Sequence, residues 1–169
     1  CILLIFIFGW YILKPTGVDL NLQFPAGWEQ AKEIKYSQGF NKPSPRDFVG
    51  FGPLTEPEAL SIYNFTLMHN FRLVIAYHTQ GQEIYWQFQN YNPPESFEIG
   101  QKLAEASGYK LSETPFNSSF AGYKDWFIQD YNRPGYTIEA GIGENPLPIS
   151  QFDQIYNDNI GILILGAIS

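Results

Sequence analysis

A histidine follows a short apolar segment, at a position where a side chain could carry acid-base or metal chemistry. Residues 71–77 are largely aliphatic and aromatic, His78 follows them, and a Thr-Gln-Gly turn at 79–81 ends the pattern. Such a run before a turn signal predicts a buried strand. The carboxyl end of a strand in an α/β protein faces the crevice where ligands bind, which places His78 for chemistry. A histidine satisfied by hydrogen bonds at a strand end is the structural alternative.

A second short apolar segment, residues 136–141, carries the carboxylate of Glu139. A glutamate in such a strand is costly to bury unless it is paired or functional. The pairing alternative is a salt bridge to Arg72 or Arg133. The functional alternative is a general base whose pKa is raised by partial burial. Neutral histidine is a zinc ligand, and a carboxylate beside a zinc-bound water can take its proton.

One histidine and one glutamate do not complete a zinc site. The chain has two histidines, and the second, His69, falls late on a predicted helix, where a role as ligand is not favoured. Cys1 is the single cysteine, which excludes an internal disulfide and a cysteine-based zinc site. Further ligands would have to come from elsewhere.

The elements that would position these groups alternate between helix and strand. A capping box of Thr55 and Glu58, with Pro57 in the first turn, predicts a helix that ends near residue 69. The other predicted elements are a short strand at 17–21, a long surface loop at 29–53, and helices at 95–107, 122–128 and 149–167. This alternation predicts an α/β fold.

Composition limits the class of protein. The chain has 169 residues, a size compatible with one domain, and 44% of them are hydrophobic, enough for a substantial core. The net charge of -7 and the absence of a Lys/Arg cluster argue against nucleic acid as a partner. Aromatic residues reach 17%, which fits either a tightly packed core or a groove for sugar- or peptide-like ligands.

The first segment, residues 1–14, has uncertain status. Residues 1–13 are apolar throughout but too few for a membrane-spanning helix, which needs about 20. No basic region precedes them and no small-residue cleavage site follows, so a signal peptide is poorly supported. A buried strand, the remnant of a longer anchor and a damaged segment remain open. Because the first residue is not Met, we expect a fragment or a processed piece.

Four motifs occur in an order and spacing that resemble the C-terminal part of the zinc metallocarboxypeptidase family, with its carboxypeptidase A-like fold. They are GVDLNLQFP (17–25), TEPE (55–58), YHTQG (77–81) and YTIE (136–139). Three further stretches resemble one bacterial subgroup, the γ-D-glutamyl-meso-diaminopimelate peptidases: HTQGQEIYW (78–86), GYKDW (122–126) and NPLP (145–148). The resemblance implies a three-layer α/β/α fold with a mixed sheet, truncated at its N-terminal side. Residues 15–169 would form this part of the catalytic domain.

The resemblance also implies roles for individual residues. His78 matches one of three zinc ligands, and Glu139 matches the general base. Asn21 matches the asparagine that binds the substrate carboxylate and backbone. Lys124 lies in the stretch that lines the pocket for the residue after the scissile bond, where it could pair with a carboxylate of diaminopimelate or instead be a solvated helix lysine. Tyr123 is a weak substitute for the family's substrate-binding tyrosine.

Three departures from the family pattern bear on function. No His-x-x-Glu motif, the source of the other two zinc ligands, occurs in this chain, so we expect those ligands upstream of it. Leu22 follows Asn21 where an arginine usually grips the substrate's terminal carboxylate, a bidentate task that leucine cannot perform. The position of the substrate-binding tyrosine falls near Phe116 or Asn117, and neither is Tyr.

The resemblance implies zinc-dependent hydrolysis of the bond between γ-D-glutamate and diaminopimelate in the stem peptides of peptidoglycan, and we expect this chain to be inactive alone. Two alternatives remain: a wall-peptide-binding module that has lost the metal, and a hydrolase that uses His78 and Glu139 without metal. The substrate class favours a location outside the cytoplasm or at the cell wall, with cytoplasmic peptide recycling or sporulation as the alternative. The oligomeric state is left open.

Overall fold

The computed structural model describes the backbone of residues 2–6, and residues 16–169 in full. The elements are β1 (Ile2–Phe6), η1 (Leu20–Leu22), α1 (Trp28–Ser37), α2 (Pro57–Leu67), β2 (Leu73–His78), β3 (Glu83–Tyr85), α3 (Ser96–Ser107), β4 (Lys110–Ser112), η2 (Phe116–Ser118), α4 (Tyr123–Tyr131), β5 (Gly135–Glu139), η3 (Ile149–Gln151) and α5 (Phe152–Ile168).

The strands form one mixed sheet in the order β1-β2-β5-β3-β4. β1, β2 and β5 run parallel, whereas β3 is antiparallel to β5 and parallel to β4. β2 is buried along its length until its last residue, as expected of a strand with parallel neighbours and helices on both faces. The β2–β5 register pairs His78 with Glu139, so the two predicted strands end side by side.

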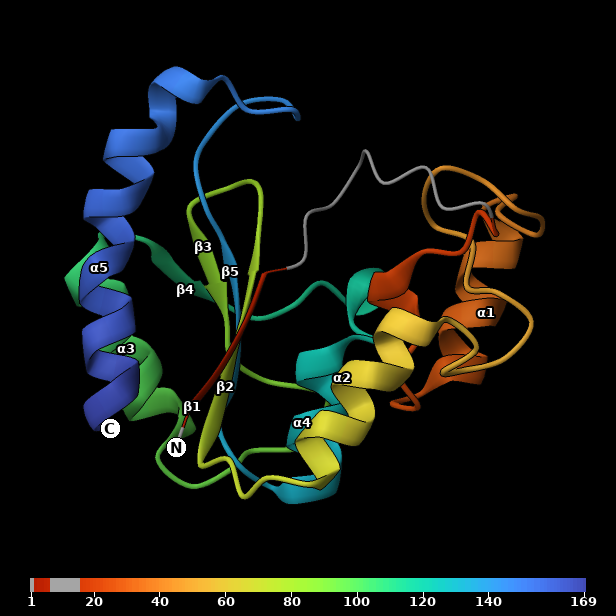
Figure 1. Ribbon diagram of the computed structural model, residues 1–169, viewed down its shortest axis with the longest axis horizontal. Coiled ribbons are helices and arrows are strands. Elements are labelled where there is room, and N and C mark those ends of the chain that lie inside the picture. The colour runs from red at the N-terminus through yellow and green to blue at the C-terminus, as the bar shows by residue number, and fades with distance from the viewer. Residues whose placement is uncertain (1, 7–15) are drawn as a thin grey trace.

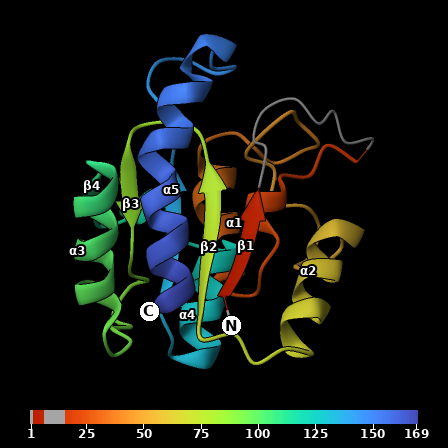
Figure 2. The ribbon, with the colours of Figure 1, turned by 60° about the vertical axis from the view of Figure 1, so that its left-hand side comes forward.

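Helices cover both faces of this sheet, which gives three layers (Figures 1 and 2). α3 and α5 lie on one face over a cluster that includes Ile75, Tyr136 and Ile138. α2 and α4 lie on the other, over a cluster that includes Val74 and Trp126. Alternate residues of β2 therefore enter different clusters, as the period of two requires. The predicted three-layer α/β/α fold with a mixed sheet is confirmed.

The sequence prediction is wrong for two segments. Residues 29–53 are not one long loop, because Trp28–Ser37 forms α1, with Trp28 and Ala31 buried. The predicted strand at 17–21 is also absent: Asp19 caps a short 3₁₀ helix, accepting a hydrogen bond from the amide of Asn21 at 3.0 Å. Aspartate favours such local bonds over extended pairing.

The capping box predicted for α2 does not form. Glu56 is the N-cap residue, and it makes no side-chain cap bond. Thr55 instead donates its amide and its hydroxyl to Oε1 of the distant, fully buried Gln23, which also accepts from the amide of Glu56. Pro57 does lie in the first turn as predicted. The orphan amides at this helix start are thus satisfied from another part of the chain.

The apolar N-terminal segment is described only in part. Residues 2–6 form β1, parallel to β2, in agreement with the strand alternative. Residues 1 and 7–15 lie outside the residues that the structure describes, so the prediction for the rest of segment 1–14 stays a prediction. Among the described residues, no helix has the length and apolar character needed to span a membrane.

Candidate active site

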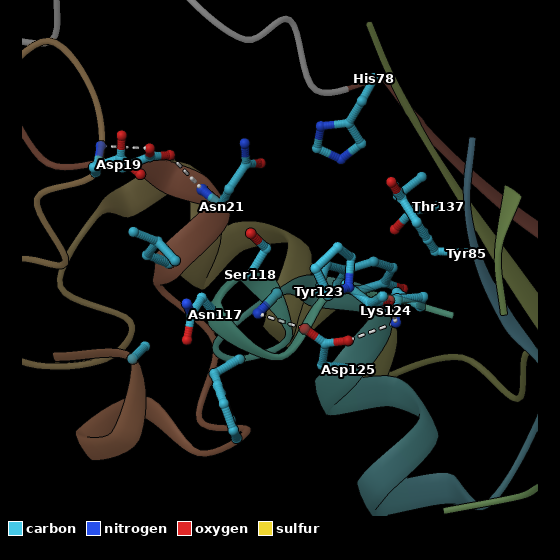
Figure 3. A pocket seen from close by; sticks show the side chains of 18 of the residues that line it. Asp19, Asn21, His78, Tyr85, Asn117, Ser118, Tyr123, Lys124, Asp125 and Thr137 are labelled. Carbon is cyan, nitrogen blue, oxygen red and sulfur yellow. Dashed lines mark hydrogen bonds and ion pairs between the residues drawn. The ribbon is translucent and has the colours of Figure 1, made fainter. Parts of the chain in front are cut away.

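His78 and Glu139 lie directly opposite each other on β2 and β5 and line one cavity of about 380 Å³. Residues two positions earlier on the same strands, Ala76 and Thr137, line it too. Tyr85, paired with Thr137 across β3 and β5, completes this wall. Figure 3 shows His78 and Asn21 reaching toward the cavity from opposite sides. The two strand-end groups thus face one crevice.

Burial controls the protonation of His78. Desolvation disfavours the charged imidazolium and lowers its pKa to about 4. The ring is therefore neutral near pH 7, the form in which histidine binds metals. The other histidine, His69, lies away from this wall: its Nδ1 is 2.7 Å from the carbonyl oxygen of Phe65, and its ring packs against Phe65 and Phe71.

Among the described residues, Arg72 and Arg133 do not pair with Glu139, contrary to the pairing alternative. Arg72 pairs with Glu95 at 2.9 Å, and Arg133 donates to Asn70 and to the carbonyl of Phe71. Burial is the main cause that raises the pKa of Glu139 to about 7, and the carboxylate of Glu83, paired with it across β3 and β5, contributes to the rise. A carboxyl that titrates near neutral pH suits a general base.

The described residues do not complete a zinc site by themselves. Among them, no three His, Cys, Asp or Glu side chains converge in a way that could hold a metal ion. At the cavity they offer one neutral imidazole, that of His78, with the Glu139 carboxylate beside it in register. This donor set fits one ligand and one neighbouring base of a catalytic zinc centre, which needs three protein ligands.

A buried ion pair lies at another part of the cavity. Lys124 and Asp125, the second and third residues of α4, line the cavity with side chains only 5% exposed each. The Lys124 Nζ lies 2.6 Å from Oδ1 of Asp125 and donates to the carbonyl of Gln87 at 2.7 Å. Asp125 Oδ2 accepts from the amide of Gly122. The solvated-lysine alternative is therefore wrong, and the side chain is part of the cavity wall.

Asn21 is held at the cavity by Asp19. The backbone amide of Asn21 donates to Oδ1 of Asp19. The side-chain Oδ1 of Asn21 is buried and has no hydrogen-bond partner among the described residues. A buried amide oxygen without a donor is costly, so this atom is a candidate to receive a donor from a ligand. Asn21 thus lines the cavity with an unpartnered acceptor, and its substrate-binding role stays a prediction.

Tyr123 fits its predicted role less well. It lines the cavity, but its hydroxyl lies 3.0 Å from Oγ1 of Thr66 on α2, and the residue is only 2% exposed. The hydroxyl that substrate binding would need is therefore engaged within the core. Of the two residues at the position expected for the family's tyrosine, Asn117 lines the cavity, whereas Phe116 is 61% exposed and packs edge-on against Phe120.

Sequence reasoning missed a charged cluster at the cavity that comprises Asp19, Lys35, Arg46 and Asp47. Lys35 and Arg46 both contact the Asp47 carboxylate, at 2.5 Å each. Although burial acts to raise the pKa of Asp47, the two cations lower it overall. These four residues come from segments assigned to a strand and a loop, so no periodic signal linked them. Thr137, by contrast, could have been found from its position two residues before Glu139.

The loops that follow the two strands are tied together. Thr79 donates its hydroxyl to Oδ1 of Asn145 at 2.8 Å, and Asn145 returns a bond from Nδ2 to the Thr79 carbonyl at 3.1 Å. The amide of Gly81 donates to the carbonyl of Gly141 at 2.9 Å. These bonds fix the residue after His78 to the loop after Glu139.

Comparison with known proteins agrees with this geometry. The model of the family described as zinc carboxypeptidase, Peptidase_M14, matches residues 12–161. The chain belongs to the zinc carboxypeptidase family. Over 151 residues, 89% of this chain, it is 49% identical to gamma-D-glutamyl-L-diamino acid endopeptidase 1 of Lysinibacillus sphaericus. It covers only 37% of that relative's length.

Solved structures show the same fold. Carboxypeptidase A from Helicoverpa armigera superimposes with a TM-score of 0.68 at 21% identity, over 89% of this chain and 41% of that one. Murein-tripeptide amidase MpaA from Escherichia coli O157 gives a TM-score of 0.59 at 20% identity, over 90% of this chain and 60% of that one. The predicted resemblance to the carboxypeptidase A-like family is confirmed, and this chain corresponds to part of the full fold.

Proposed function

We propose that the protein is a zinc-dependent peptidase that hydrolyses the bond between γ-D-glutamate and diaminopimelate in cell-wall peptides. The observation that carries this proposal is the register of β2 and β5, which sets His78 beside a carboxyl of near-neutral pKa in one cavity. The 49% identity to an enzyme named as a gamma-D-glutamyl-L-diamino acid endopeptidase supports the substrate class.

Glu139 is the general base in this proposal. It takes a proton from the attacking water and returns it to the amine that leaves when the peptide bond breaks. His78 serves as one ligand of a zinc ion, together with two ligands that the described residues do not supply. Zinc, when bound, supplies Lewis-acid polarisation of the scissile carbonyl.

The Lys124–Asp125 pair suits the side chain of diaminopimelate. That side chain ends in both an ammonium and a carboxylate, and Lys124 and Asp125 place opposite charges side by side on the cavity wall. In a poorly solvated site, charge complementarity discriminates strongly against an apolar side chain. The unpartnered Oδ1 of Asn21 accepts a donor from the peptide backbone.

The test is cleavage of L-alanyl-γ-D-glutamyl-meso-diaminopimelate by the full-length protein, which would supply the two further zinc ligands expected upstream of this chain, with its zinc content measured. We expect Glu139→Gln to lower kcat by about 10²- to 10⁴-fold, the usual contribution of a general base. The matched control Glu105→Gln, on the exposed surface of α3, should leave kcat unchanged. Equal activity of the wild type and the Glu139→Gln variant would contradict the assigned base.

A binding module without catalysis is the second candidate, because the described residues hold no complete metal site. The same experiment separates the two. Stoichiometric zinc with cleavage supports the peptidase, whereas peptide binding without zinc and without cleavage supports the module. A location outside the cytoplasm or at the cell wall follows from the proposed substrate and stays a prediction.

A further inference from the structure

A second cavity, of about 310 Å³, lies at the end of the sheet away from His78 and Glu139. It is formed by the segments that precede β2, α3 and β5, and its lining consists of Asn70, Arg72, Pro94, Glu95, Asn132, Arg133 and Pro134. Figure 1 shows the segments before β2 and β5 at one end of the sheet and the turns after these strands at the other. Arg72 lies directly before β2 and His78 ends it, so the two residues are roughly 20 Å apart.

Arg133 is held at this second cavity with part of its guanidinium unused. Its Nη1 donates to Oδ1 of Asn70 at 2.7 Å and to the carbonyl of Phe71 at 2.5 Å. Among the described residues the guanidinium has no other bond, which leaves the N–H groups of Nε and Nη2 as donors. Two acceptors on one nitrogen fix the orientation of the guanidinium, so less entropy is lost when a ligand binds to it.

Arg72 also keeps unused donors. Its Nη2 donates to Oε2 of Glu95 at 2.9 Å, in an ion pair whose side chains are 46% and 61% exposed. The N–H groups of Nε and Nη1 have no partner in the part of the chain that the structure describes. An ion pair this exposed contributes little to stability, so an entering anion can displace Glu95 from Arg72.

The lining as a whole is rich in donors and carries an excess of positive charge. Its seven residues include two arginines and a single carboxylate, that of Glu95. The side-chain nitrogens of Asn70 and Asn132 add donors for which the described residues supply no acceptor. The local charge is positive although the whole chain has a net charge of -7. The lining therefore favours an anionic ligand.

The number of donors favours a phosphate group over a carboxylate. A carboxylate has two oxygens and occupies one guanidinium fork, whereas a phosphate monoester has three terminal oxygens that two guanidiniums can share. The cavity volume corresponds to that of roughly ten water molecules in the liquid, which leaves room for an organic group on the phosphate. Pro94 and Pro134 offer apolar contact to such a group.

We propose that this cavity is a second binding site, which takes a phosphate monoester between Arg72 and Arg133. The two guanidiniums bind the terminal phosphate oxygens, and the proline rings contact the organic part of the ligand. The site shares no lining residue with the cavity that holds His78 and Glu139. It therefore does not depend on the proposed peptidase activity.

The test is calorimetric titration of the full-length protein at low ionic strength with three probes: glycerol 3-phosphate, inorganic phosphate and acetate. We expect glycerol 3-phosphate to bind with a dissociation constant of about 0.05 to 5 mM, the range that two charge-assisted hydrogen bonds provide. Inorganic phosphate should bind more weakly, because it has no organic group to contact the prolines. Acetate should bind most weakly, because it occupies one fork only.

Arg133→Gln and Arg72→Gln should each weaken the binding of glycerol 3-phosphate by about tenfold or more. Glu95→Gln should strengthen it by about threefold or more, because a competing carboxylate is removed. The matched control is Lys102→Gln, which removes one positive charge from the exposed surface of α3 outside the cavity and should leave the affinity unchanged. Thermal unfolding without ligand checks that each variant is folded. Arg133→Lys, which keeps the charge and lacks the fork, should bind more weakly than the wild type as well.

Failure of all three probes to bind would overturn the proposal, as would an unchanged affinity in both arginine variants. An equal loss in Lys102→Gln would show a general effect of charge and would also overturn it. Acetate that binds as tightly as glycerol 3-phosphate would reject the phosphate class. Cleavage of the stem peptide is measured separately, and its failure would reject the peptidase without affecting the assignment of this site.

Discussion

Glu139 faces a second carboxylate, Glu83, across the β5–β3 pair, and both lie near the end of the sheet where His78 reaches the cavity. Like charges in direct opposition destabilise a sheet. The folded protein relieves the repulsion by protonating Glu139, whose pKa rises to about 7, with burial as the main cause. The proposed general base is therefore held at a cost to stability.

This cost predicts that Glu139→Gln stabilises the metal-free protein at high pH. The folded pKa of Glu139, about 7, lies above its ordinary value of 4.5. The folded state thus binds the proton more tightly, and the free energy of unfolding falls as pH rises from 4.5 through 7. We expect the variant to exceed the wild type by on the order of 1–3 kcal/mol at pH 8 and to match it near pH 4. Urea denaturation at pH 4 and at pH 8 measures the stability of both proteins. An equal stability difference between variant and wild type at the two pH values would contradict the prediction.

The buried Lys124–Asp125 pair predicts strong coupling between its members. Lys124→Met removes the cation and leaves a carboxylate that is 5% exposed without its partner, which should cost about 3–5 kcal/mol. The double variant with Asp125→Asn should recover at least half of that loss, because no charge remains and the amide oxygen can still accept from Gly122. Urea denaturation of the four proteins measures the coupling. Additive effects of the two substitutions would show that the pair is not energetically linked.

Leu22 and the same ion pair together predict which peptides the enzyme neglects. A blocked dipeptide ending in phenylalanine would place an apolar ring against Lys124 and Asp125 and find no arginine at position 22. We expect its kcat/KM to be about tenfold or more below that of a stem peptide. A comparison of kcat/KM for the two substrates tests this. Faster turnover of the dipeptide would contradict the specificity derived from these residues.

At the scale of elements, the start of α2 depends on a side chain far away in sequence. Gln23 is fully buried, accepts from the amides of Thr55 and Glu56, and donates to the carbonyls of Val49 and Gly52. Gln23→Leu would leave these four backbone groups without that partner. We expect a loss of about 3 kcal/mol or more in urea denaturation, since each buried unpaired group costs about 1–3 kcal/mol. Gln23→Glu, which keeps the acceptors but sets a carboxylate against two carbonyls, should recover part of it. Full stability of the leucine variant would show that water replaces the side chain.

The elements that could be predicted from sequence are those with a local signal. β2 and β5 have apolar runs with turns after them, and α3 ends at Gly108 in the left-handed conformation, as a C-cap glycine predicts. α1 was missed because its surface is largely polar and only Trp28 and Ala31 are buried. Thr55 matched a capping pattern, but it donates its hydrogen bonds to Gln23, a residue 32 positions away, and so does not cap the helix.

The residues of the candidate site also differ in whether the sequence alone could identify them. His78, Glu139 and Asn21 belong to motifs, so a resemblance could identify them, and the alternation of a strand links Thr137 to Glu139. Arg46 could not be found, because its place depends on Asp19 bonding to the amide of Asp47 across a loop. Contacts of this kind have no periodicity, and only the folded chain brings them together.

At the scale of the whole molecule, the described residues supply one imidazole to the cavity, that of His78. Calorimetric titration of the 169-residue chain with zinc should therefore show no one-to-one site approaching the roughly 10 kcal/mol or more of complete structural sites. His78→Ala is the control for whatever weak binding remains. A tight site that this substitution abolishes would mean that the chain contributes ligands not recognised among the described residues.

The pairing of His78 with Glu139 also constrains how such genes can diverge. Tyr136 and Ile138 enter the cluster under α3 and α5, while Thr137 and Glu139 line the cavity. Deleting one codon inside β5 would exchange these two sets, driving a carboxylate into hydrocarbon and an isoleucine into the cavity. Substitutions can accumulate in this strand one at a time, whereas a change of length by one residue moves several side chains to the wrong face of the sheet at once. Insertions and deletions should therefore collect in connections such as residues 86–95 and be rare between residues 135 and 139 among descendants that keep the same chemistry.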